Sequence, residues 1–265
     1  MNALALKNLE TDDLLPPRRA ANAYLTEIRY ELTRTLRNPA LAIPMMVLPV
    51  GLYLLFAVLL FGDAIAKDPA VGIFFFAGFA VLGVTMPALF TISSSLAVER
   101  EMGLMKLKRA QPAPAGGWLV AKLTAGVLFS ALAYLPMAVA AVVTGKLPLS
   151  GMQVAAMSAA LIAGTIPFCA LGLMVGALVK GSAAPGYANL IYLPGCYLSG
   201  LFFPLPQSMH WQTALWPQFH VSQLAMHAAG LQKFQFIPVT MAVATLIGFT
   251  ALFSAVALWR LARKG

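Results

Sequence analysis

Six stretches of this sequence contain no Asp, Glu, Lys or Arg and are apolar over most of their length. This pattern argues against a water-soluble fold. A helix needs about 20 such residues to cross the hydrocarbon core of a bilayer. The stretches are Ala40–Phe61, Ala70–Ala97, Leu123–Gly145, Met152–Val179, Tyr187–Phe203 and Phe236–Trp259. We therefore expect an all-α integral membrane protein with six spans, at about 40–61, 70–97, 119–145, 152–179, 187–203 and 236–259. The fifth span is the shortest, and Pro194-Gly195 near its middle predicts a kink or a break.

The composition agrees with a chain that lies mostly in lipid. Hydrophobic residues make up 60% of it and charged residues only 10%, whereas soluble domains carry about 25% charged residues. Both cysteines, Cys169 and Cys196, fall inside apolar stretches. We interpret them as small apolar residues within the membrane, and we expect no disulfide.

The basic residues are distributed unevenly between the two sides of such a domain. Fifteen of the eighteen Lys and Arg residues fall in the N-terminal segment, the loops after the second and fourth spans, and the tail. Lys67, Lys146 and Lys233 fall on the opposite side. Because cytoplasmic loops carry the excess of Lys and Arg, both termini are expected in the cytoplasm. The net charge of +9 is then a topology signal, and it gives no reason to expect nucleic acid.

The chain divides into four parts on this reading. We expect a flexible cytoplasmic N-terminus over residues 1–17, an amphipathic helix over 18–38, the six-span domain over 40–259 and a cytoplasmic tail over 260–265. The first apolar stretch follows a long polar segment and is too long for a signal peptide, so we expect no cleaved leader.

The spans lack the groups that would power or catalyse a reaction. Ion-driven transporters normally keep ionisable residues at membrane depth, and the six stretches hold no Asp, Glu, Lys or Arg. Discontinuous helices could still bind sodium through backbone carbonyls. A phosphate-binding loop needs Gly-Lys followed by Ser or Thr, but Gly145-Lys146 is followed by Leu. We expect no enzyme activity in this chain, so any uphill transport must draw its energy from another protein.

The three histidines, His210, His220 and His227, lie in the segment between the fifth and sixth spans. His220 and His227 are seven residues apart and could share a helix face. Neither Cys nor a carboxylate lies near them in the sequence, so we expect no metal site.

The segment Arg18–Arg37 is the first charged feature on the cytoplasmic side. Leu25, Ile28, Leu32 and Leu36 follow helical spacing and predict one apolar face. Asn38-Pro39 ends the helix. The pattern is typical of an amphipathic helix that lies along the membrane surface. It serves either as a simple anchor or as a docking surface, and the residues alone favour neither.

The second charged feature is VEREMGLMKLKRAQPAP, Val98–Pro114, between the second and third spans. Glu99 and Glu101 are the last acids of the chain, and they stand at a helix C-terminus, where the helix dipole disfavours negative charge. They require compensation from Arg100, from Lys106 or from a partner protein. The alternative, a loop that only sets topology, explains the basic residues but not the two acids.

In this arrangement the chain resembles the type-2 ABC transporter permeases, a family of drug, polysaccharide and lipid exporters. VEREMGLMKLKRAQPAP is similar to the family's loop after the second span, with Glu-Arg-Glu, a Gly, then basic residues and Pro. The segment Tyr197–Ala225 is similar to the family's region after the fifth span, where short helices dip back into the outer leaflet. The resemblance covers essentially all of Ala20–Arg263.

The resemblance implies two paired permease chains, each docked to one cytoplasmic ATPase that binds ATP and Mg. The resemblance implies that the loop Val98–Pro114 forms a coupling helix that contacts the ATPase, and that the Arg18–Arg37 helix supports the same contact. The coupling residues that it implies are Glu99, Arg100, Glu101, Gly103, Lys106 and Arg109, with Glu27 and Arg34. Substrate would lie between the two copies, with Phe75, Phe79, Met86, Tyr192 and Tyr197 as cavity candidates. Helix packing or lipid contact is the alternative for each of these five.

The function expected from these features is export of an apolar or amphipathic substrate, a drug, lipid or peptide, across a bacterial inner membrane. The uncharged spans favour such a substrate over a lipid-linked glycan, whose phosphates would attract basic groups. A sodium- or glycan-exporting permease of the same family stays open as an alternative. So does a non-transporting membrane partner of an ATPase. An enzyme that acts on lipid would need catalytic groups at membrane depth, which the spans lack.

Overall fold

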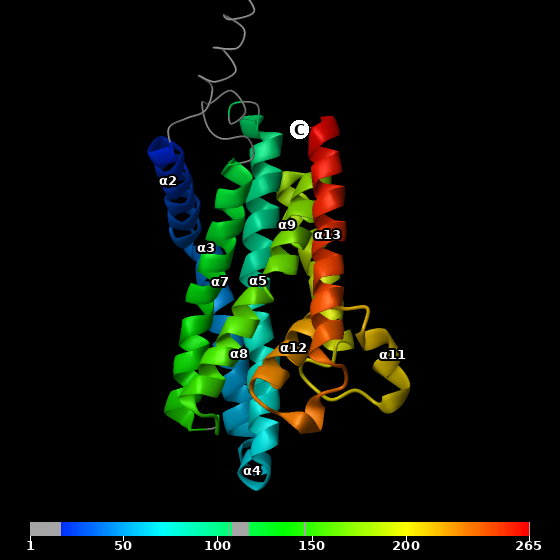
Figure 1. Ribbon diagram of the computed structural model, residues 1–265. Coiled ribbons are helices and arrows are strands. Elements are labelled where there is room, and N and C mark those ends of the chain that lie inside the picture. The colour runs from blue at the N-terminus through cyan, green and yellow to red at the C-terminus, as the bar shows by residue number, and fades with distance from the viewer. Residues whose placement is uncertain (1–16, 106, 108–116, 146, 265) are drawn as a thin grey trace, which may run out of the picture.

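The computed structural model describes residues 17–105, 107, 117–145 and 147–264. All regular elements within these ranges are helices. Figure 1 shows them as one bundle, with α2 beside its upper end and α4 at its lower end; we call these the α2 end and the α4 end. Five helical stretches in the described part are long and apolar enough to cross a membrane: Pro39–Leu60, Pro69–Glu101, Gly117–Thr144, Gly151–Leu178 and Val239–Arg263.

The helix α5 (Pro69–Glu101) forms the centre of the bundle, where it packs against α3, α7 and α9. Asp68 begins it, because its Oδ1 accepts the N–H of Ala70 at 3.0 Å. Its 33 residues correspond to about 50 Å, which exceeds the roughly 30 Å of a bilayer core. The helix is therefore longer than a single crossing requires, and its charged residues, Glu99, Arg100 and Glu101, all lie at its C-terminal end.

The first span is built from α3 (Pro39–Tyr53) and a π-helix, η1 (Leu54–Leu60), which continues it without a break. Pro44 and Pro49 stand inside α3 and each removes one backbone hydrogen bond. A helical hairpin turn through α4 (Gly62–Lys67) then leads into α5. The bounds agree with the predicted span 40–61 to within a residue.

The fourth predicted span consists of two helices, α8 (Gly151–Ala163) and α9 (Ile166–Leu178). Pro167 has no N–H to continue the hydrogen-bond ladder of α8, so the helix is interrupted at Gly164 and Thr165. A Cβ on Gly164 would lie 2.5 Å from Cγ1 of Val221, so glycine lets α12 (Pro217–Ala228) approach this joint. The third span, α7 (Gly117–Thr144), is one continuous helix.

The fifth predicted span, residues 187–203, differs most from the structure. The helix found there, α10 (Ala184–Leu198), has 15 residues and a length of about 22 Å, which is short for a complete crossing. It stays helical across Pro194-Gly195, so of the two predicted alternatives, a kink or a break, the break is wrong. The chain turns instead at Gly200, where φ is +72°. The carbonyl oxygen of Leu201 then lies against Gly78 of α5, only 2.0 Å from where a Cβ would stand.

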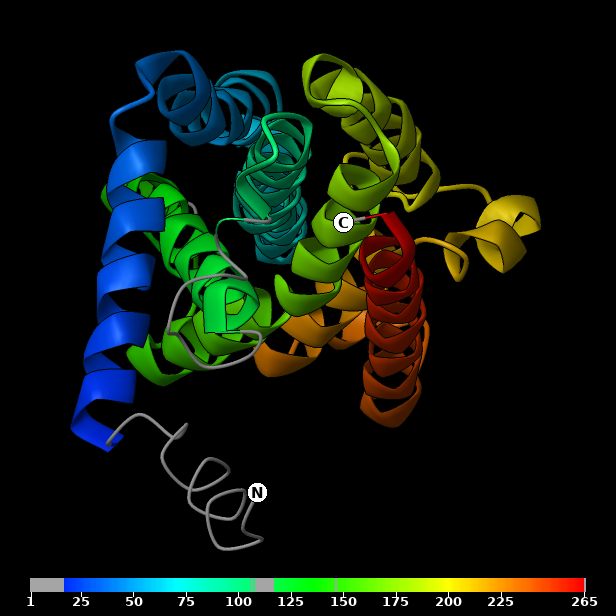
Figure 2. The ribbon, with the colours of Figure 1, turned by 90° about the horizontal axis from the view of Figure 1, so that it is seen from above.

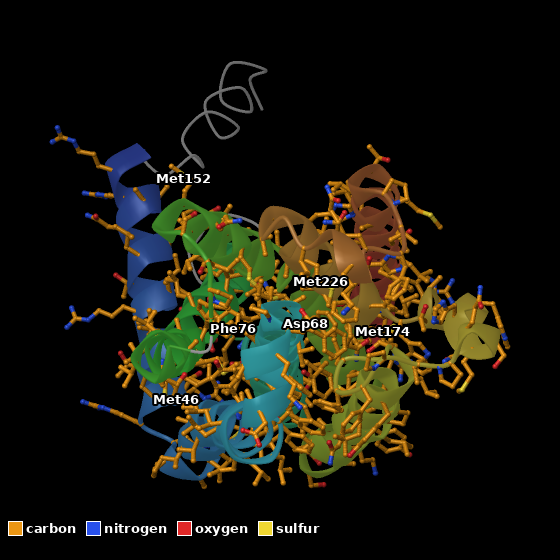
Figure 3. The ribbon with its side chains drawn as sticks, turned by 90° about the horizontal axis from the view of Figure 1, so that it is seen from below. Met46, Asp68, Phe76, Met152, Met174 and Met226 are labelled. Carbon is orange, nitrogen blue, oxygen red and sulfur yellow. The ribbon has the colours of Figure 1, made fainter. Side chains whose placement is uncertain are left out.

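The segment between α10 and the last helix, α13 (Val239–Lys264), holds α12 and the single-turn α11 (His210–Thr213). The resemblance implies short helices in this segment, and α11 and α12 are short. Viewed from above, α11 projects from the side of the bundle opposite α2 (Figure 2). Viewed from below, Met226 of α12 and Asp68 lie near the middle of the α4 end (Figure 3).

Each histidine of this segment contacts a backbone carbonyl through Nε2. His210 contacts Leu205 at 3.0 Å, His220 contacts Ala214 at 2.8 Å and His227 contacts Ile237 at 2.8 Å. His220 and His227 share α12 but bind different parts of the chain. The histidines therefore fasten the turns around α11 and α12, and no group of three potential metal ligands occurs among the residues that the structure describes.

Candidate functional site

The helix α2 (Pro17–Leu36) lies along the edge of the bundle and packs against α7 (Figure 2). The side chain of Tyr24 covers Gly117 at the start of α7. The predicted apolar face is only partly turned inward, because Leu25 and Leu36 are 63% and 44% exposed. The residue of α2 that is most deeply buried is an acid, Glu31, at 4% exposure. Its burial indicates that a cation from the bundle meets it.

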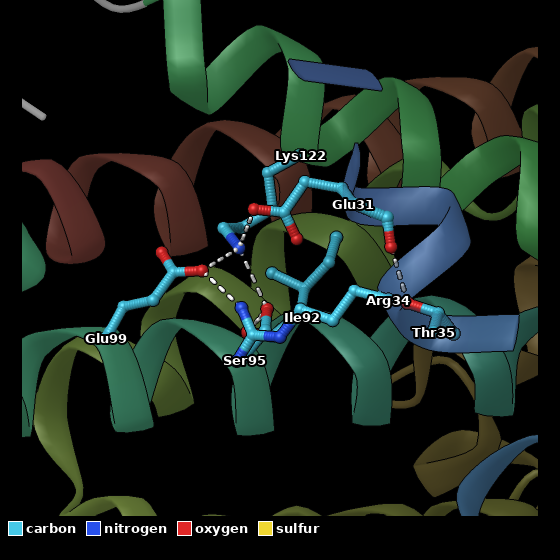
Figure 4. A network of polar contacts seen from close by, with 7 residues as sticks. All are labelled: Glu31, Arg34, Thr35, Ile92, Ser95, Glu99 and Lys122. Atoms are coloured by element: carbon cyan, nitrogen blue, oxygen red, sulfur yellow. Dashed lines mark hydrogen bonds and ion pairs between the residues drawn. The ribbon is translucent and has the colours of Figure 1, made fainter. Parts of the chain in front are cut away.

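That cation is Lys122, one and a half turns into α7. Its Nζ lies 2.7 Å from Oε1 of Glu31, 2.9 Å from Oε1 of Glu99 and 3.0 Å from Oγ of Ser95 (Figure 4). The guanidinium of Arg34 donates to the same Oε1 of Glu99 at 2.6 Å. We name Glu31, Arg34, Ser95, Glu99 and Lys122 the charged junction. It joins α2, α5 and α7 at the α2 end.

The charges of the five junction residues balance, and most of these side chains are closed to solvent. Two carboxylates face two cations, and the side chains of Lys122 and Glu99 are each 2% exposed. Arg34 keeps contact with solvent, since its side chain is 37% exposed. Burying an isolated charge costs several kcal/mol, so these groups are stable here only because they remain paired. The junction consequently holds the three helices in one fixed relationship.

Arg100 and Glu101 bind a different part of the chain. Nη1 of Arg100 donates to the carbonyl oxygens of Gly176 at 2.7 Å and Val179 at 3.4 Å, at the C-terminal end of α9. A cation is favourable there because the last carbonyls of a helix lack backbone partners. The carboxylate of Glu101 accepts the N–H of Gly181 at 3.0 Å. Three consecutive residues, Glu99 to Glu101, thus fasten the end of α5 to both sides of the bundle.

The residues implied for coupling are therefore brought together only in part. Glu99 and Arg34 contact each other, while Arg100 and Glu101 contact the α9–α10 connection. Gly103 follows α5 with φ +72° and is exposed, so it lets the chain turn away from the helix. Glu27 lies half-buried on α2. Lys106 and Arg109 lie outside the described residues.

Glu99 finds its compensation within the chain. Arg34 and Lys122 contact its carboxylate, whereas Arg100, one of the expected sources, binds the carbonyl oxygens of Gly176 and Val179 instead. A contribution from Lys106 or from a partner protein stays a prediction. Lys122 and Glu31 are the residues that sequence reasoning missed. Lys122 is one of the fifteen basic residues interpreted from the sequence as topology signals, yet it stands inside the apolar helix α7. The sequence does contain a signal for this, because Lys122 has apolar residues on both sides, Trp118–Ala121 before it and the apolar stretch from Leu123 after it.

The five cavity candidates occupy different environments. Phe75, Phe79 and Tyr192 are at most 4% exposed, and Met86 is half-buried. The hydroxyl of Tyr192 shares a hydrogen bond of 2.7 Å with Oγ1 of Thr85 inside the bundle. Tyr197 is 63% exposed. In this conformation Tyr197 is the candidate that faces outward, and the first three pack within the chain.

Phe75 and Phe79 belong to an aromatic cluster near the α4 end. Their rings lie 6.3 Å apart and are stacked, and each contacts the ring of Phe56 in η1. Phe202 and Phe203, which follow α10, close the cluster through contacts with Phe79 and Phe56. The cluster therefore connects the first span, α5 and the chain after α10.

In the described part of the chain, a bundle of five helical stretches that are long and apolar enough to span a membrane, with a charged junction at one end, defines an all-α integral membrane protein. The sequence model of the ABC-2 type transporter family matches residues 22–228, and the chain belongs to this family. It is also similar to a protein of Bacillus subtilis (strain 168) named as a transport permease, YvfS. The two are 21% identical over 193 residues, which cover 72% of this chain and 78% of that protein.

Proposed function

We propose that this chain is the membrane subunit of an ATP-driven exporter for an apolar or amphipathic substrate. In this proposal two copies of the chain pair in a bacterial inner membrane, with both termini in the cytoplasm. Each copy docks a separate cytoplasmic ABC ATPase, which binds ATP and Mg. The family membership supports the transport role, and the distribution of basic residues supports the orientation.

The observation that carries the proposal is the charged junction together with Arg100 and Glu101. The described chain that follows it exposes Met102 and Leu107 at 68% and 63%. A force on this tip is transmitted into α5, because the end of α5 is bonded to α2 and α7 on one side and to α9 on the other. Since separating buried ion pairs is costly, α2, α7 and the end of α5 move as one unit. An ATPase at the tip would therefore rock the spans.

The proposed substrate route runs along α5 and α10 between two copies of the chain. Helix α10 carries exposed apolar side chains that a second copy or the substrate would cover, namely Tyr187, Leu190, Leu193 and Tyr197. No Asp, Glu, Lys or Arg occurs within α10. An uncharged surface of this kind suits a drug, a lipid or an apolar peptide better than an anion.

The test compares the chain alone with the chain co-expressed with its candidate ATPase. The purified chain alone is expected to hydrolyse no ATP, and the complex is expected to hydrolyse ATP and to be stimulated by its substrate. A panel of lipids, drugs, peptides and sodium identifies the substrate class and separates the apolar-substrate proposal from sodium export. ATP turnover by the isolated chain, or failure to retain any ATPase, would overturn the proposal.

A further inference from the structure

A cavity of about 190 Å³ lies at the α4 end, away from the charged junction. Its wall is formed by Phe74 of α5, by the turn at Ser199–Leu205, by α11 and α12, and by Phe236-Ile237 before α13. A space of about 10–15 Å³ is enough for one water molecule by the same measure. The cavity is therefore large enough for part of an organic molecule.

The chemistry of the wall favours an uncharged apolar guest. The rings of Phe74, Phe219 and Phe236 and the side chain of Met226 line it, and no Asp, Glu, Lys or Arg is found among its described lining residues. The polar side chains of the wall already bind the backbone. Oγ of Ser222 donates to Phe219 O at 3.1 Å, and Oγ1 of Thr213 donates to His210 O at 2.7 Å.

Gln223 completes this satisfied wall. Its Nε2 donates to Phe234 O at 3.1 Å, and its Oε1 accepts the N–H of Phe236 at 2.7 Å. Because the amide nitrogen and the amide oxygen each have a hydrogen-bond partner in the chain, Gln223 needs no polar group from a bound molecule. Apolar cavities without unmet polar groups stay dry and bind apolar ligands.

The mouth of the cavity adjoins the surface that faces lipid. Phe236 is 49% exposed, and Val239, the first residue of the helix α13, is 43% exposed. An apolar chain that lies against α13 can thus reach the cavity over the exposed ring of Phe236. Pro204 forms part of the lining and is also exposed.

We propose that this cavity binds the acyl chain of a bilayer lipid from the leaflet at the α4 end. The site belongs to a single copy of the chain and lies far from the ATPase-docking end. It does not depend on the direction of transport or on the partner, so it can be tested without the ATPase.

The test uses the full chain in liposomes that contain phosphatidylethanolamine with a diazirine near the end of one acyl chain. Irradiation is expected to attach the lipid to peptides that contain Phe74 or Met226. The variant Ala214→Phe places a ring inside the cavity and should lower these adducts roughly tenfold, because excluding two methylenes costs about 1.4 kcal/mol. The matched control is Leu215→Phe, the next residue, which is 62% exposed and should leave the adducts unchanged.

Adducts on lipid-facing residues of α13 such as Leu252 and Leu258 provide the internal standard, since all variants should give them equally. Should Ala214→Phe not fold, Ser222→Leu narrows the same cavity with a smaller change. The proposal is overturned if Phe74 and Met226 label no more than Leu252 does, or if filling the cavity leaves their labelling intact.

Discussion

One ammonium group, Nζ of Lys122, lies 2.7 Å from the carboxylate of Glu31 and 2.9 Å from that of Glu99. The first carboxylate comes from α2 and the second from the end of α5, so α7 holds together two elements that are far apart in the sequence. Glu99 is followed by Arg100, which binds the end of α9, and by Glu101, which binds Gly181. The end of α5 is therefore bonded directly to α2, α7 and the connection between α9 and α10.

Lys122→Met should destabilise the protein severely. Methionine keeps most of the side-chain volume but removes the cation that Glu31 and Glu99 share, and breaking a buried pair in this way costs about 3–5 kcal/mol. The thermal unfolding temperature of the detergent-purified chain should fall. The double variant Lys122→Met/Glu31→Gln should recover part of the loss, because Glu99 retains Arg34.

Lys180→Met is the matched control for Lys122, since Lys180 is exposed and exposed pairs contribute about 0–1 kcal/mol. Equal unfolding temperatures for the Lys122 and Lys180 variants would show that the charged junction does not stabilise the bundle.

Two variants of Glu101 distinguish a role in anchoring α5 to Gly181 from a role in recognising a partner protein. Glu101→Ala should leave expression largely intact and uncouple ATP hydrolysis from transport in the complex. Glu101→Gln keeps an oxygen that can accept the N–H of Gly181 but removes the charge. If the bond to Gly181 transmits the motion, glutamine should retain most of the coupling and alanine should lose it.

The measurement is the ratio of substrate transported to ATP hydrolysed, in the reconstituted complex. Loss of coupling in both variants would assign the function to the charge and to a partner. Normal coupling in both would show that Glu101 has no part in it.

Gly78→Ala should be among the most damaging small substitutions in the bundle. The added Cβ would stand 2.0 Å from the carbonyl oxygen of Leu201, which is backbone and cannot rotate away. Overpacking of this kind costs about 1–3 kcal/mol or more. Gly51→Ala is the control, because nothing lies within 4 Å of its added Cβ and alanine favours a helix over glycine by roughly 0.5–1 kcal/mol. Unfolding temperatures that move in the same direction for both variants would contradict the close contact.

Five of the six predicted spans correspond to long apolar helices of the described chain, because a bilayer imposes a minimum length on every apolar helix that crosses it. Prediction was less successful where a local contact decides the outcome. The close approach of α12 at Gly164 depends on Val221, and the end of α10 depends on how Leu201 packs against Gly78. Both contacts join residues more than 50 positions apart, and no spacing rule reveals them. The charged junction could be predicted only in part. The sequence indicates that Glu99 needs a compensating charge, but it does not show that α2 packs against α7 and so brings Glu31 and Lys122 together.

His220 should give the segment around α12 a dependence on pH. Burial lowers the pKa of His220 below its ordinary value, and the weaker effect of the Ala214 carbonyl opposes this. Its Nδ1 is also buried and has no hydrogen-bond partner in the described part of the chain. A histidine whose pKa is lower in the folded than in the unfolded state stabilises the fold above the unfolded pKa, about 6.5, and this contribution is lost as the pH falls toward the folded pKa. His220→Gln keeps a donor for Ala214 and cannot titrate, so its unfolding temperature should fall less than that of the wild type between pH 8 and pH 5. Carboxylates titrate equally in both proteins and cancel in the comparison, and parallel curves would show that His220 does not carry the effect.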